Sequence, residues 1–330
     1  MSFIDHQLYV QPLDATIDPH HPCDRAIITH GHADHARAGH GKVLATPDTI
    51  EIMKRRYGPT CAGSFQALDY GEIITDCGVE ISFHPAGHIL GSAQVRLRYA
   101  GETVVCTGDY KTAPDSTSAS FELVPCDIFI TEATFGLPVF RHPPAAREIE
   151  KLIKSHQSLP DRPHLIGAYA LGKAQRVIKL LRDAGYDAPL YLHGAHSALC
   201  EFYQSRGVEL GRLVPVTEAS KDELNRGITL APPSALRDRW ARRFKDPVLG
   251  FASGWMSVKQ RAKQRLVELP LVISDHADWD ELTTTIPQTG ADTIWVTHGR
   301  EDALIHWCET KGLKAEPLSL QGREEEPEGA

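Results

Sequence analysis

Short apolar runs separated by glycine, proline and aspartate dominate the first 135 residues of this chain. The runs at residues 43–46, 80–83 and 103–106 are too short for helices, so they predict strands. Histidine or acidic side chains follow several of these strands. The pattern returns at residues 269–274 and 292–297, and a histidine follows each run within two residues. Polar groups collected at strand ends are typical of an α/β sandwich.

The stretch between residues 143 and 265 has a different pattern. Apolar positions at helical spacing predict helices at 143–157 and 172–184, and strand-like runs lie at 163–168 and 189–192. Helices that alternate with strands in this way indicate an inserted α/β domain.

We therefore expect the first domain to be discontinuous. Its first part spans residues 1–140, the insertion spans 141–268, and the return segment spans 269–320. Residues 321–330 are acidic and lack an apolar anchor, so they are expected to be a disordered tail.

The net charge of −8 gives the 330-residue chain no overall basic character, so a nucleic-acid partner would have to be bound by a local cluster. Seven scattered cysteines without a CxxC pair indicate reduced thiols and argue against a cysteine-based zinc site. The N-terminus does not look like a secretion signal, and no apolar run approaches eighteen residues. We expect a soluble, cytoplasmic protein that does not enter a membrane.

The most informative motif is HxHxDH, which places His30, His32, Asp34 and His35 directly after the apolar residues 25–28. Imidazole nitrogens and carboxylate oxygens are ligands that suit zinc or manganese. These side chains are too many for one tetrahedral ion once more distant ligands join them. The sequence therefore predicts two metal ions.

Five further segments join the HxHxDH motif: Asp18 in TIDP, His88 in AGHILGS, Asp109 in TGDY, His276 in SDHADW and His298 in VTHG. Together these segments resemble the metallo-β-lactamase fold. Glu132 in ITEATFG is similar to the acidic first motif of the β-CASP nuclease branch, and the resemblance runs from about residue 18 to residue 299. It implies an αββα sandwich with an inserted β-CASP domain.

The resemblance also implies a role for each motif residue. One metal would be held by His30, His32 and His88, the other by Asp34, His35 and His298, and Asp109 would bridge them. Two such cations polarise a phosphodiester oxygen and lower the pKa of a water molecule. The catalytic residues would be Asp34, Glu132 and His276, with His276 oriented by Glu132 to stabilise charge or to protonate the leaving oxygen. Asp18 would orient ligands rather than bind metal.

Two basic clusters are candidates for substrate binding, each with a simpler alternative. Lys173 and Arg176 follow a glycine-containing turn that resembles one in β-CASP domains, where a helix N-terminus could take a phosphate or could merely be capped. Arg239, Arg242 and Arg243 surround Trp240 and form either a nucleic-acid track or a solvated helix face.

Within the branch, the chain most resembles bacterial ligase-associated DNA exonucleases, which are thought to act in DNA repair beside an ATP-dependent ligase and a helicase. DNA is the expected substrate. RNA is the alternative, because His298 is typical of the mRNA 3′-end processing members. A lactonase or thioesterase would not need Glu132, His276 or a basic insertion, and a catalytically dead binding module would be expected to have lost ligands. The choice of zinc or manganese and the mode of digestion stay open.

Overall fold

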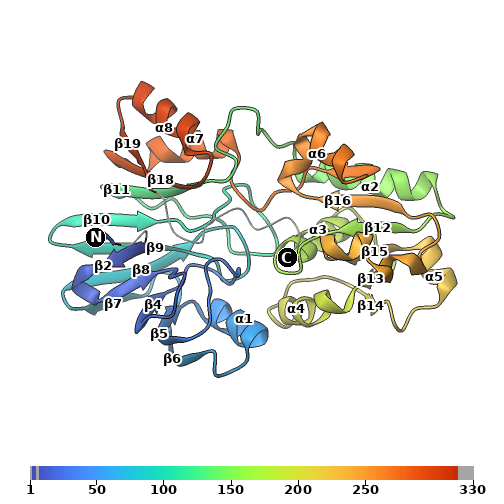
Figure 1. Ribbon diagram of the computed structural model, residues 1–330, viewed down its shortest axis with the longest axis horizontal. Coiled ribbons are helices and arrows are strands. Elements are labelled where there is room, and N and C mark those ends of the chain that lie inside the picture. The colour runs from blue at the N-terminus through green and yellow to red at the C-terminus, as the bar shows by residue number, and fades with distance from the viewer. Residues whose placement is uncertain (1, 5–6, 319–330) are drawn as a thin grey trace. The chain divides into compact units, whose positions relative to one another are not determined.

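The computed structural model describes residues 2–4 and 7–318 and divides into two compact units. The first unit takes the chain up to Arg141 and resumes at His276, and the second spans His142–Asp275. In Figure 1 the first unit carries the blue and red ends of the colour scale, and the second carries the yellow-green and orange middle. The first unit is therefore interrupted in sequence by the second.

The strands of the first unit form two sheets. In the first sheet the strand order is β1 (Ser2–Ile4), β2 (Gln7–Val10), β3 (Ala15–Ile17), β4 (Arg25–Ile27), β5 (His40–Ala45) and β6 (Ala62–Ala67). In the second sheet the order is β19 (Lys314–Pro317), β18 (Thr293–Gly299), β11 (Ile128–Ala133), β10 (Glu102–Cys106), β9 (Ala93–Tyr99), β8 (Val79–Pro85) and β7 (Ile73–Asp76).

Alternating side chains explain how these sheets pack. In β5, Leu44 points to a core that the two sheets share, whereas Val43 and Ala45 point to the opposite face. The shared core contains residues such as Leu8 and Ile17 from the first sheet and Phe83, Val95 and Ile130 from the second.

Helices cover the outer face of each sheet. Ile50 and Met53 of α1 (Pro47–Tyr57) join the core on the outside of the first sheet. On the outside of the second sheet, α7 (Trp279–Gln288) and α8 (Glu301–Thr310) contribute Leu282 and Leu304. Figure 1 shows these helices against their sheets. The layers α, β, β and α confirm the predicted sandwich.

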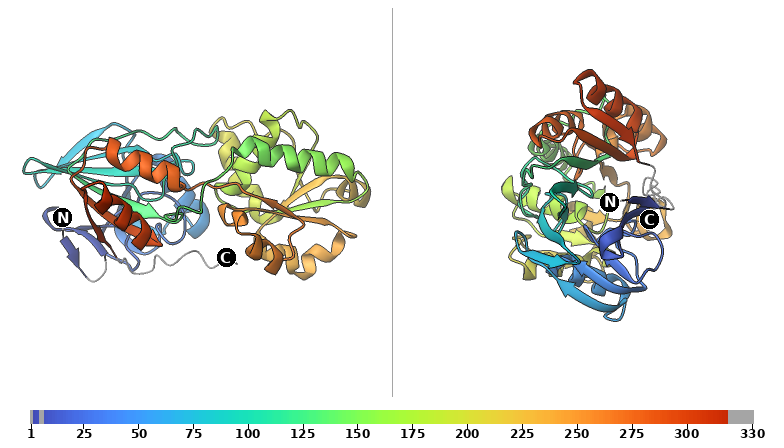
Figure 2. Two further views of the ribbon diagram at one scale, coloured as in Figure 1. Left: turned by 90° about the horizontal axis from the view of Figure 1, so that it is seen from above. Right: turned by 90° about the vertical axis from the view of Figure 1, so that its left-hand side faces the viewer.

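The second unit contains a parallel sheet with helical crossovers, visible in Figure 2. Its strand order is β14 (Leu213–Pro215), β13 (Leu190–Leu192), β15 (Ile228–Ala231), β12 (His164–Gly167), β16 (Val248–Ala252) and β17 (Leu269–Leu271). The helices are α2 (Ala145–Ser158), α3 (Lys173–Asp183), α4 (Gly194–Ser205), α5 (Lys221–Arg226) and α6 (Lys259–Gln264). Short 3-10 helices are η1 (Gln11–Leu13) in the first unit, and η2 (Pro233–Arg237), η3 (Arg239–Arg243) and η4 (Gly254–Ser257) in the second.

The predicted helices 143–157 and 172–184 correspond to α2 and α3. The predicted domain boundaries after residues 140 and 268 stay a prediction. In the structure the second unit extends to Asp275, because β17 pairs with β16 in the sheet of that unit. The predicted disordered tail, residues 321–330, lies outside the described residues.

Other features of the described chain bear on the sequence predictions. All seven cysteines lie among the described residues and carry free thiols. Among the described helices, none has the length and apolarity that crossing a membrane requires.

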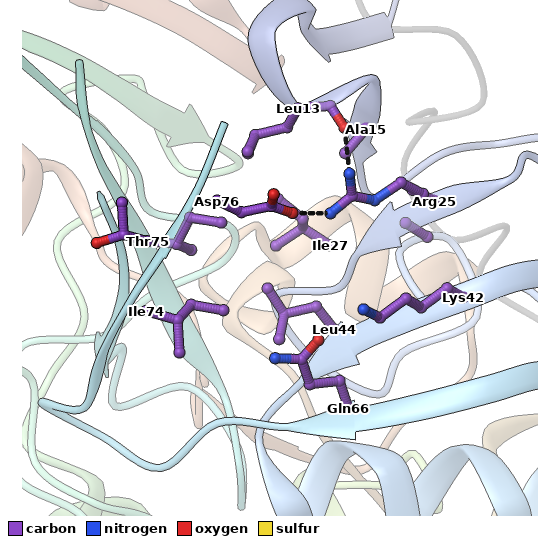
Figure 3. A pocket seen from close by; sticks show the side chains of 12 residues that line it. Leu13, Ala15, Arg25, Ile27, Lys42, Leu44, Gln66, Ile74, Thr75 and Asp76 are labelled. Atoms are coloured by element: carbon purple, nitrogen blue, oxygen red, sulfur yellow. Dashed lines mark hydrogen bonds and ion pairs between the residues drawn. The ribbon is translucent and has the colours of Figure 1, made fainter. Parts of the chain in front are cut away.

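A cavity of about 410 Å³ lies beside the first residues of β4, lined by Leu13, Ile27 and Leu44 among others. Figure 3 shows the Arg25 guanidinium there, donating to the Leu13 carbonyl at 2.7 Å and to the Asp76 carboxylate. The HxHxDH motif follows the other end of β4, so this cavity does not belong to the predicted metal site.

Candidate metal centre

Strand geometry gathers the predicted ligands at one end of the sandwich. Strands β10, β11 and β18 are neighbours and run parallel, so their carboxyl ends lie at the same edge of the sheet. Asp109 follows β10, whereas Glu132 and His298 lie near the ends of β11 and β18. The HxHxDH motif follows β4 of the facing sheet. Residues far apart in sequence thus meet where strands end.

Two close backbone approaches shape this edge. Gly299 has a φ of +118°, and a Cβ there would lie 2.3 Å from the Ala133 carbonyl oxygen. The pairing of β11 with β18 shifts register between Glu132 and Ala133, which is the irregularity that brings these backbones together. Gly108 has a φ of +56°, and its Cβ would lie 2.7 Å from the Thr29 hydroxyl. Glycine at these positions lets the segments carrying His298 and Asp109 approach their neighbours.

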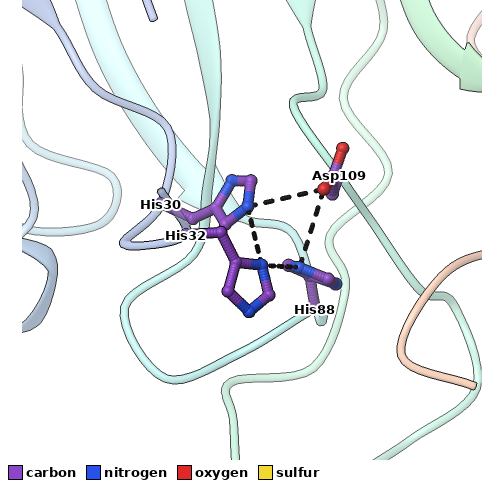
Figure 4. Close-up of side chains that lie close together, drawn as sticks. All are labelled: His30, His32, His88 and Asp109. Carbon is purple, nitrogen blue, oxygen red and sulfur yellow. Dashed lines mark hydrogen bonds and ion pairs between the residues drawn. The ribbon is translucent and has the colours of Figure 1, made fainter. Parts of the chain in front are cut away.

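One group of potential ligands consists of His30, His32, His88 and Asp109, whose ligand atoms lie within 4.8 Å of one another. The His32 Nδ1 atom is 3.2 Å from the Nε2 atom of His30 and 3.0 Å from that of His88. Figure 4 shows the three rings and the carboxylate directed toward a common point. Three imidazoles and one carboxylate match the coordination number and ligand chemistry of zinc.

A second group adjoins the first. Ligand atoms of Asp34, His35 and His298 also lie within 4.8 Å of one another. The Asp109 Oδ2 atom is 3.4 Å from the Nε2 atom of His35 and 3.4 Å from that of His30. Asp109 therefore lies between the groups, in the position that a bridging ligand would need.

The unsatisfied atoms of this site fit divalent cations. Within the described residues, Asp34 Oδ1 and His298 Nδ1 are buried and have no hydrogen-bond partner. A buried polar atom without a partner typically costs about 1–3 kcal/mol, so native proteins seldom keep one without a reason. A cation bound among these atoms would supply the missing partner. The donor set and its geometry thus fit two divalent metal ions.

Electrostatics favour the protonation states that bind metal. Burial lowers the pKa of His30 well below its ordinary value, and the neighbouring histidines lower it further. Burial alone would raise the pKa of Asp109, but His35, His298 and His276 outweigh it and hold that pKa well below the usual range. The pKa of Asp34 is also lowered, because His35 outweighs the effect of burial. Neutral imidazoles and ionised carboxylates are the forms that ligate metals.

Asp18 orients the HxHxDH segment. Its carboxylate accepts hydrogen bonds from the Thr29 amide and the Thr29 hydroxyl, both at 2.7 Å. Its Oδ2 atom is also 2.8 Å from His35 Nδ1, which fixes that ring with Nε2 toward Asp34 and Asp109. The sequence suggested an orienting role for Asp18 but gave no sign of the contribution of Thr29.

His276 and Glu132 form a pair beside the ligand groups. His276 Nδ1 lies 2.9 Å from Glu132 Oε2 and 3.9 Å from Asp109 Oδ2. The Glu132 carboxylate is buried and also accepts hydrogen bonds from the Tyr110 amide at 2.7 Å and the Thr134 hydroxyl at 2.5 Å. The His276 side chain keeps 19% of its surface exposed. It is therefore held by a fixed carboxylate and accessible to a ligand.

Further contacts tie the residues after Asp109 to the start of α7. Lys111 donates to Glu281 at 2.9 Å, and the same carboxylate accepts from the Ala113 amide at 2.7 Å. The Ala277 amide donates to the Tyr110 carbonyl at 2.6 Å, next to His276. Sequence reasoning missed these residues, although Asp278 and Glu281 have the spacing of a helix capping box, which the structure contains.

Lys173 and Arg176 lie at the start of α3, as expected, but each is only 3% exposed. Lys173 donates to the Asp275 carboxylate at 2.5 Å and to the Ile273 carbonyl at 3.0 Å. Arg176 donates to the Ser274 carbonyl at 2.7 Å. Both cations thus hold the segment that directly precedes His276. Substrate binding by these residues stays a prediction, and their contacts favour a positioning role.

Arg239, Arg242 and Arg243 lie on η3 and are exposed. Arg243 lies 5.0 Å above the Trp240 ring, and that ring contacts His193 at a centroid distance of 4.7 Å. Exposure and stacking are compatible with a nucleic-acid track, but they do not test it.

Comparison with known proteins gives several relatives. No model of a known protein family matches the chain. A "Probable DNA ligase" of Opitutus terrae is 27% identical over 94% of this chain, which corresponds to 30% of the relative. "Transcription termination factor FttA" of Pyrococcus abyssi is 30% identical over 56% of the chain and 36% of the relative. "Integrator complex subunit 11" of Danio rerio is 35% identical over 35% of the chain and 20% of the relative.

These relatives and the ligand groups are consistent with the resemblance to the β-CASP branch of the metallo-β-lactamase fold. The chain spans about a third or less of the length of these three relatives. Among solved structures, a protein of unknown function from Enterococcus faecalis V583 has a TM-score of 0.60 at 12% identity, covering 92% of this chain and 80% of that one, which supports the fold alone.

Proposed function

We propose that this protein is a β-CASP metal-dependent nuclease that hydrolyses phosphodiester bonds in DNA, as an exonuclease that serves repair. The observation that carries the proposal is the pair of adjoining ligand groups that share Asp109, with the His276–Glu132 pair beside them. Two bound zinc or manganese ions would supply Lewis acidity and an activated water for attack on phosphorus. One ion would be held by His30, His32 and His88 and the other by Asp34, His35 and His298.

The protein's own groups would manage the proton and the geometry. Hydrolysis forms a bond from water oxygen to phosphorus and breaks the bond from phosphorus to the leaving oxygen, which must gain a proton. Glu132 holds the Nδ1 side of His276, so that imidazole can give a proton to the leaving oxygen from Nε2. Asp18 keeps His35 in its ligating orientation, and the Lys111–Glu281 pair fixes the segment beside His276.

The preference for DNA is supported by the extent of one comparison. The relative named as a probable DNA ligase matches 94% of this chain, whereas the match to the transcription termination factor covers 56%. Because that relative is more than three times as long as the matched part, we also propose that the nuclease acts with an ATP-dependent ligase. A helicase partner stays a prediction from the sequence.

RNA hydrolysis is the second candidate, and His298 favours it. This histidine lies in the second ligand group, and the resemblance that predicts RNA processing rests on this position. Fungal relatives named as endoribonucleases support the same reading, with 30% identity over 43% of this chain in Gibberella zeae.

The test compares end-labelled single-stranded DNA and RNA of identical sequence. Metal-stripped protein receives zinc or manganese, and Asp109→Ala serves as the control. Faster, Asp109-dependent loss of DNA label one nucleotide at a time would support the DNA exonuclease. Faster cleavage of RNA would instead support the second candidate function, RNA processing. If the protein cleaved neither polymer but hydrolysed a lactone or thioester, the nuclease proposal would fail.

A further inference from the structure

The parallel sheet of the second unit carries, at its carboxyl edge, polar residues that the proposed mechanism does not use. Strand β15 lies between β13 and β12 and runs parallel to both, so the three carboxyl ends lie at one edge. His193 follows β13, and η2 and η3 follow β15. Ligands of open parallel sheets bind at this edge. His193 and η3 therefore lie where the fold favours a binding site.

His193 is held in one orientation. Its Nδ1 atom accepts a hydrogen bond from the Ala195 amide at 3.1 Å, and its own amide donates to the Leu230 carbonyl at 2.9 Å. Because Nδ1 accepts, the proton of the neutral ring is on Nε2. Burial and the positive charge of Arg243 lower the pKa of His193, which favours this neutral form. His193 thus offers one N–H donor at the edge of the sheet.

Arg243 is held beside it by Trp240. Arg243 Nε donates to the Trp240 carbonyl at 3.0 Å, and the guanidinium lies over the Trp240 ring, 5.0 Å from its centroid. The same ring contacts His193 at a centroid distance of 4.7 Å and Phe244, which is buried, at 5.3 Å. Arg243 is exposed, and within the described residues its two Nη groups donate no hydrogen bond. An arginine held in this way loses little freedom when it binds an anion.

Acidic side chains do not match the positive charge of η3. Asp238 caps η3 through the Arg239 amide at 2.6 Å, and Asp246 pairs with Arg162 at 3.1 Å. Across residues 2–4 and 7–318, none of the three arginines of η3 forms an ion pair with a carboxylate. The surface therefore presents positive charge that a ligand can neutralise.

The spacing of the arginines fits a polymer of phosphates. A 3-10 helix has three residues per turn and rises about 2.0 Å per residue, so Arg239 and Arg242 share one face about 6 Å apart. This separation is less than two nucleotide steps of about 3.4 Å each along a stacked strand. Phosphates that are close neighbours in one strand can therefore contact both arginines.

The same edge of the sheet positions the segment that carries the proposed proton donor. The start of α3 follows β12 and holds residues 273–275, which lead directly to His276. His196, in the first turn of α4, has its Nε2 atom 3.1 Å from the Ala168 carbonyl oxygen, one residue after β12. The residues around His193 thus adjoin the part of the unit that fixes the approach to His276.

We propose that His193 and Arg243 bind one phosphate of a single-stranded nucleic acid, with Trp240 as their positioning residue and adjoining phosphates on Arg239 and Arg242. The phosphate accepts hydrogen bonds from His193 Nε2 and from the Nη groups of Arg243, whose fork matches phosphate oxygens. Phosphate contacts carry no base sequence, so this subsite serves DNA and RNA alike. The inference rests on the proposed nuclease function and adds a substrate subsite outside the metal centre.

The first test measures affinity for a thymidine oligomer with the full-length protein stripped of metal, which binds without hydrolysis. Arg243→Gln should weaken binding about tenfold, the loss expected of a charge-assisted hydrogen bond, and should flatten the slope of log affinity against log salt by about 0.7. In the metal-loaded protein, the same variant should raise KM for DNA by a similar factor. The matched control is Arg206→Gln, because Arg206 also stacks on an aromatic ring, that of Phe202 at 5.2 Å, but lies at the other end of α4. It should change neither quantity by more than a small fraction of these effects.

Variants of the neighbours separate the shared phosphate from general charge. His193→Asn keeps a residue that caps helices well and removes the Nε2 donor, so it should weaken binding several-fold and leave the salt slope unchanged. Combined with Arg243→Gln, it should cost less than the product of the two single losses, because both residues contact one phosphate. The matched control is His156→Asn, which removes a half-buried histidine in contact with the Tyr186 ring at 5.6 Å.

The positioning role of Trp240 is tested by rescue. Trp240→Leu should weaken binding several-fold with an unchanged salt slope, because Arg243 keeps its charge but loses its support. Trp240→Phe restores an aromatic ring and should recover most of the affinity. A Trp240→Leu variant that bound as tightly as the wild-type protein would exclude this role.

The class of partner is tested with poly-glutamate of the same number of charges, which should bind at least tenfold more weakly than the oligomer. Equal binding of poly-glutamate with the same dependence on Arg243 would overturn the subsite in favour of an acidic protein segment. Full affinity in Arg243→Gln, or an equal loss in Arg206→Gln, would also overturn it. If such a protein still hydrolysed nucleic acid in an Asp109-dependent way, the subsite alone would fail. A protein that neither bound nor hydrolysed DNA or RNA would overturn the proposed function as well.

Discussion

The polar side chains of the candidate metal centre in the first unit are buried and have fixed partners, whereas the arginines of η3 in the second unit are exposed. In the metal centre, His30, His35 and Asp109 are buried, and each contacts other ligands or an orienting carboxylate. In the second unit, η3 is a short 3-10 helix that exposes Arg239, Arg242 and Arg243. A buried polar or charged group needs a fixed partner to offset its lost hydration, whereas an exposed charge stays hydrated by water. The contrast teaches that the side chains of the candidate metal centre are preorganised, whereas the exposed arginines can adapt their positions.

The largest expected effect comes from the shared ligand. Asp109→Ala should reduce hydrolysis to the background rate and lower the metal content below two ions per chain, because Asp109 adjoins both ligand groups. Activity and metal content are measured on the same preparation. Asp183→Ala is the control, since it removes an aspartate of α3 that pairs with Lys179 and belongs to neither ligand group. An active Asp109→Ala enzyme with two ions would contradict the bridging position.

Removing the proposed proton donor should separate chemistry from metal binding. His276→Ala should lower kcat by about 10²- to 10⁴-fold and keep two ions per chain, because loss of a general acid affects turnover. His306→Ala, which removes an exposed histidine of α8, should have no effect. Full activity in the His276 variant would exclude this role for the residue.

The orienting contact should have a smaller effect. Asp18→Ala should weaken metal affinity by about 10- to 100-fold, as is usual when a partner of a ligating histidine is lost. The measurement is a competition between the protein and a chelator of known affinity. Unchanged affinity would mean that His35 keeps its orientation without the contact at 2.8 Å.

Changes in the exposed arginines should have the smallest effect on chemistry. Reversing Arg239, Arg242 and Arg243 to glutamate should weaken binding of single strands and flatten the slope of log affinity against log salt by about 2, since about 0.7 is lost per phosphate contact. The control reverses Lys154, Arg206 and Lys221, which are exposed residues of the same unit. Equal effects in the two triple variants would show that only net charge matters.

The proximity of the candidate metal ligands could be predicted from the sequence, because they come in compact motifs at strand ends. HxHxDH contributes four candidate ligands within six residues, and the parallel strands that carry Asp109, Glu132 and His298 must end at one edge. The α/β sandwich and the discontinuous first domain were predicted from the short apolar runs that stop near residue 135 and return at residue 269. These features depend on local sequence and on general rules of sheet packing.

The sequence could not decide features that depend on distant partners. A helix start with Lys173 and Arg176 looks the same whether the cations face a phosphate or a buried carboxylate, and Asp275 is 102 positions away. The apolar run at 269–271 could extend either sheet, and only its pairing with β16 assigns it to the second unit. Thr29 and Tyr110 act partly through backbone amides, which leave no pattern in side-chain chemistry.

The most direct test of the account is stepwise return of metal to the stripped protein while hydrolysis of labelled DNA and RNA is followed. The account predicts that hydrolysis of at least one polymer rises until two ions are bound per chain, and that Asp109→Ala does not recover at any ratio. Hydrolysis of either polymer by stripped protein at the full rate would contradict it, as would two bound ions without hydrolysis of either.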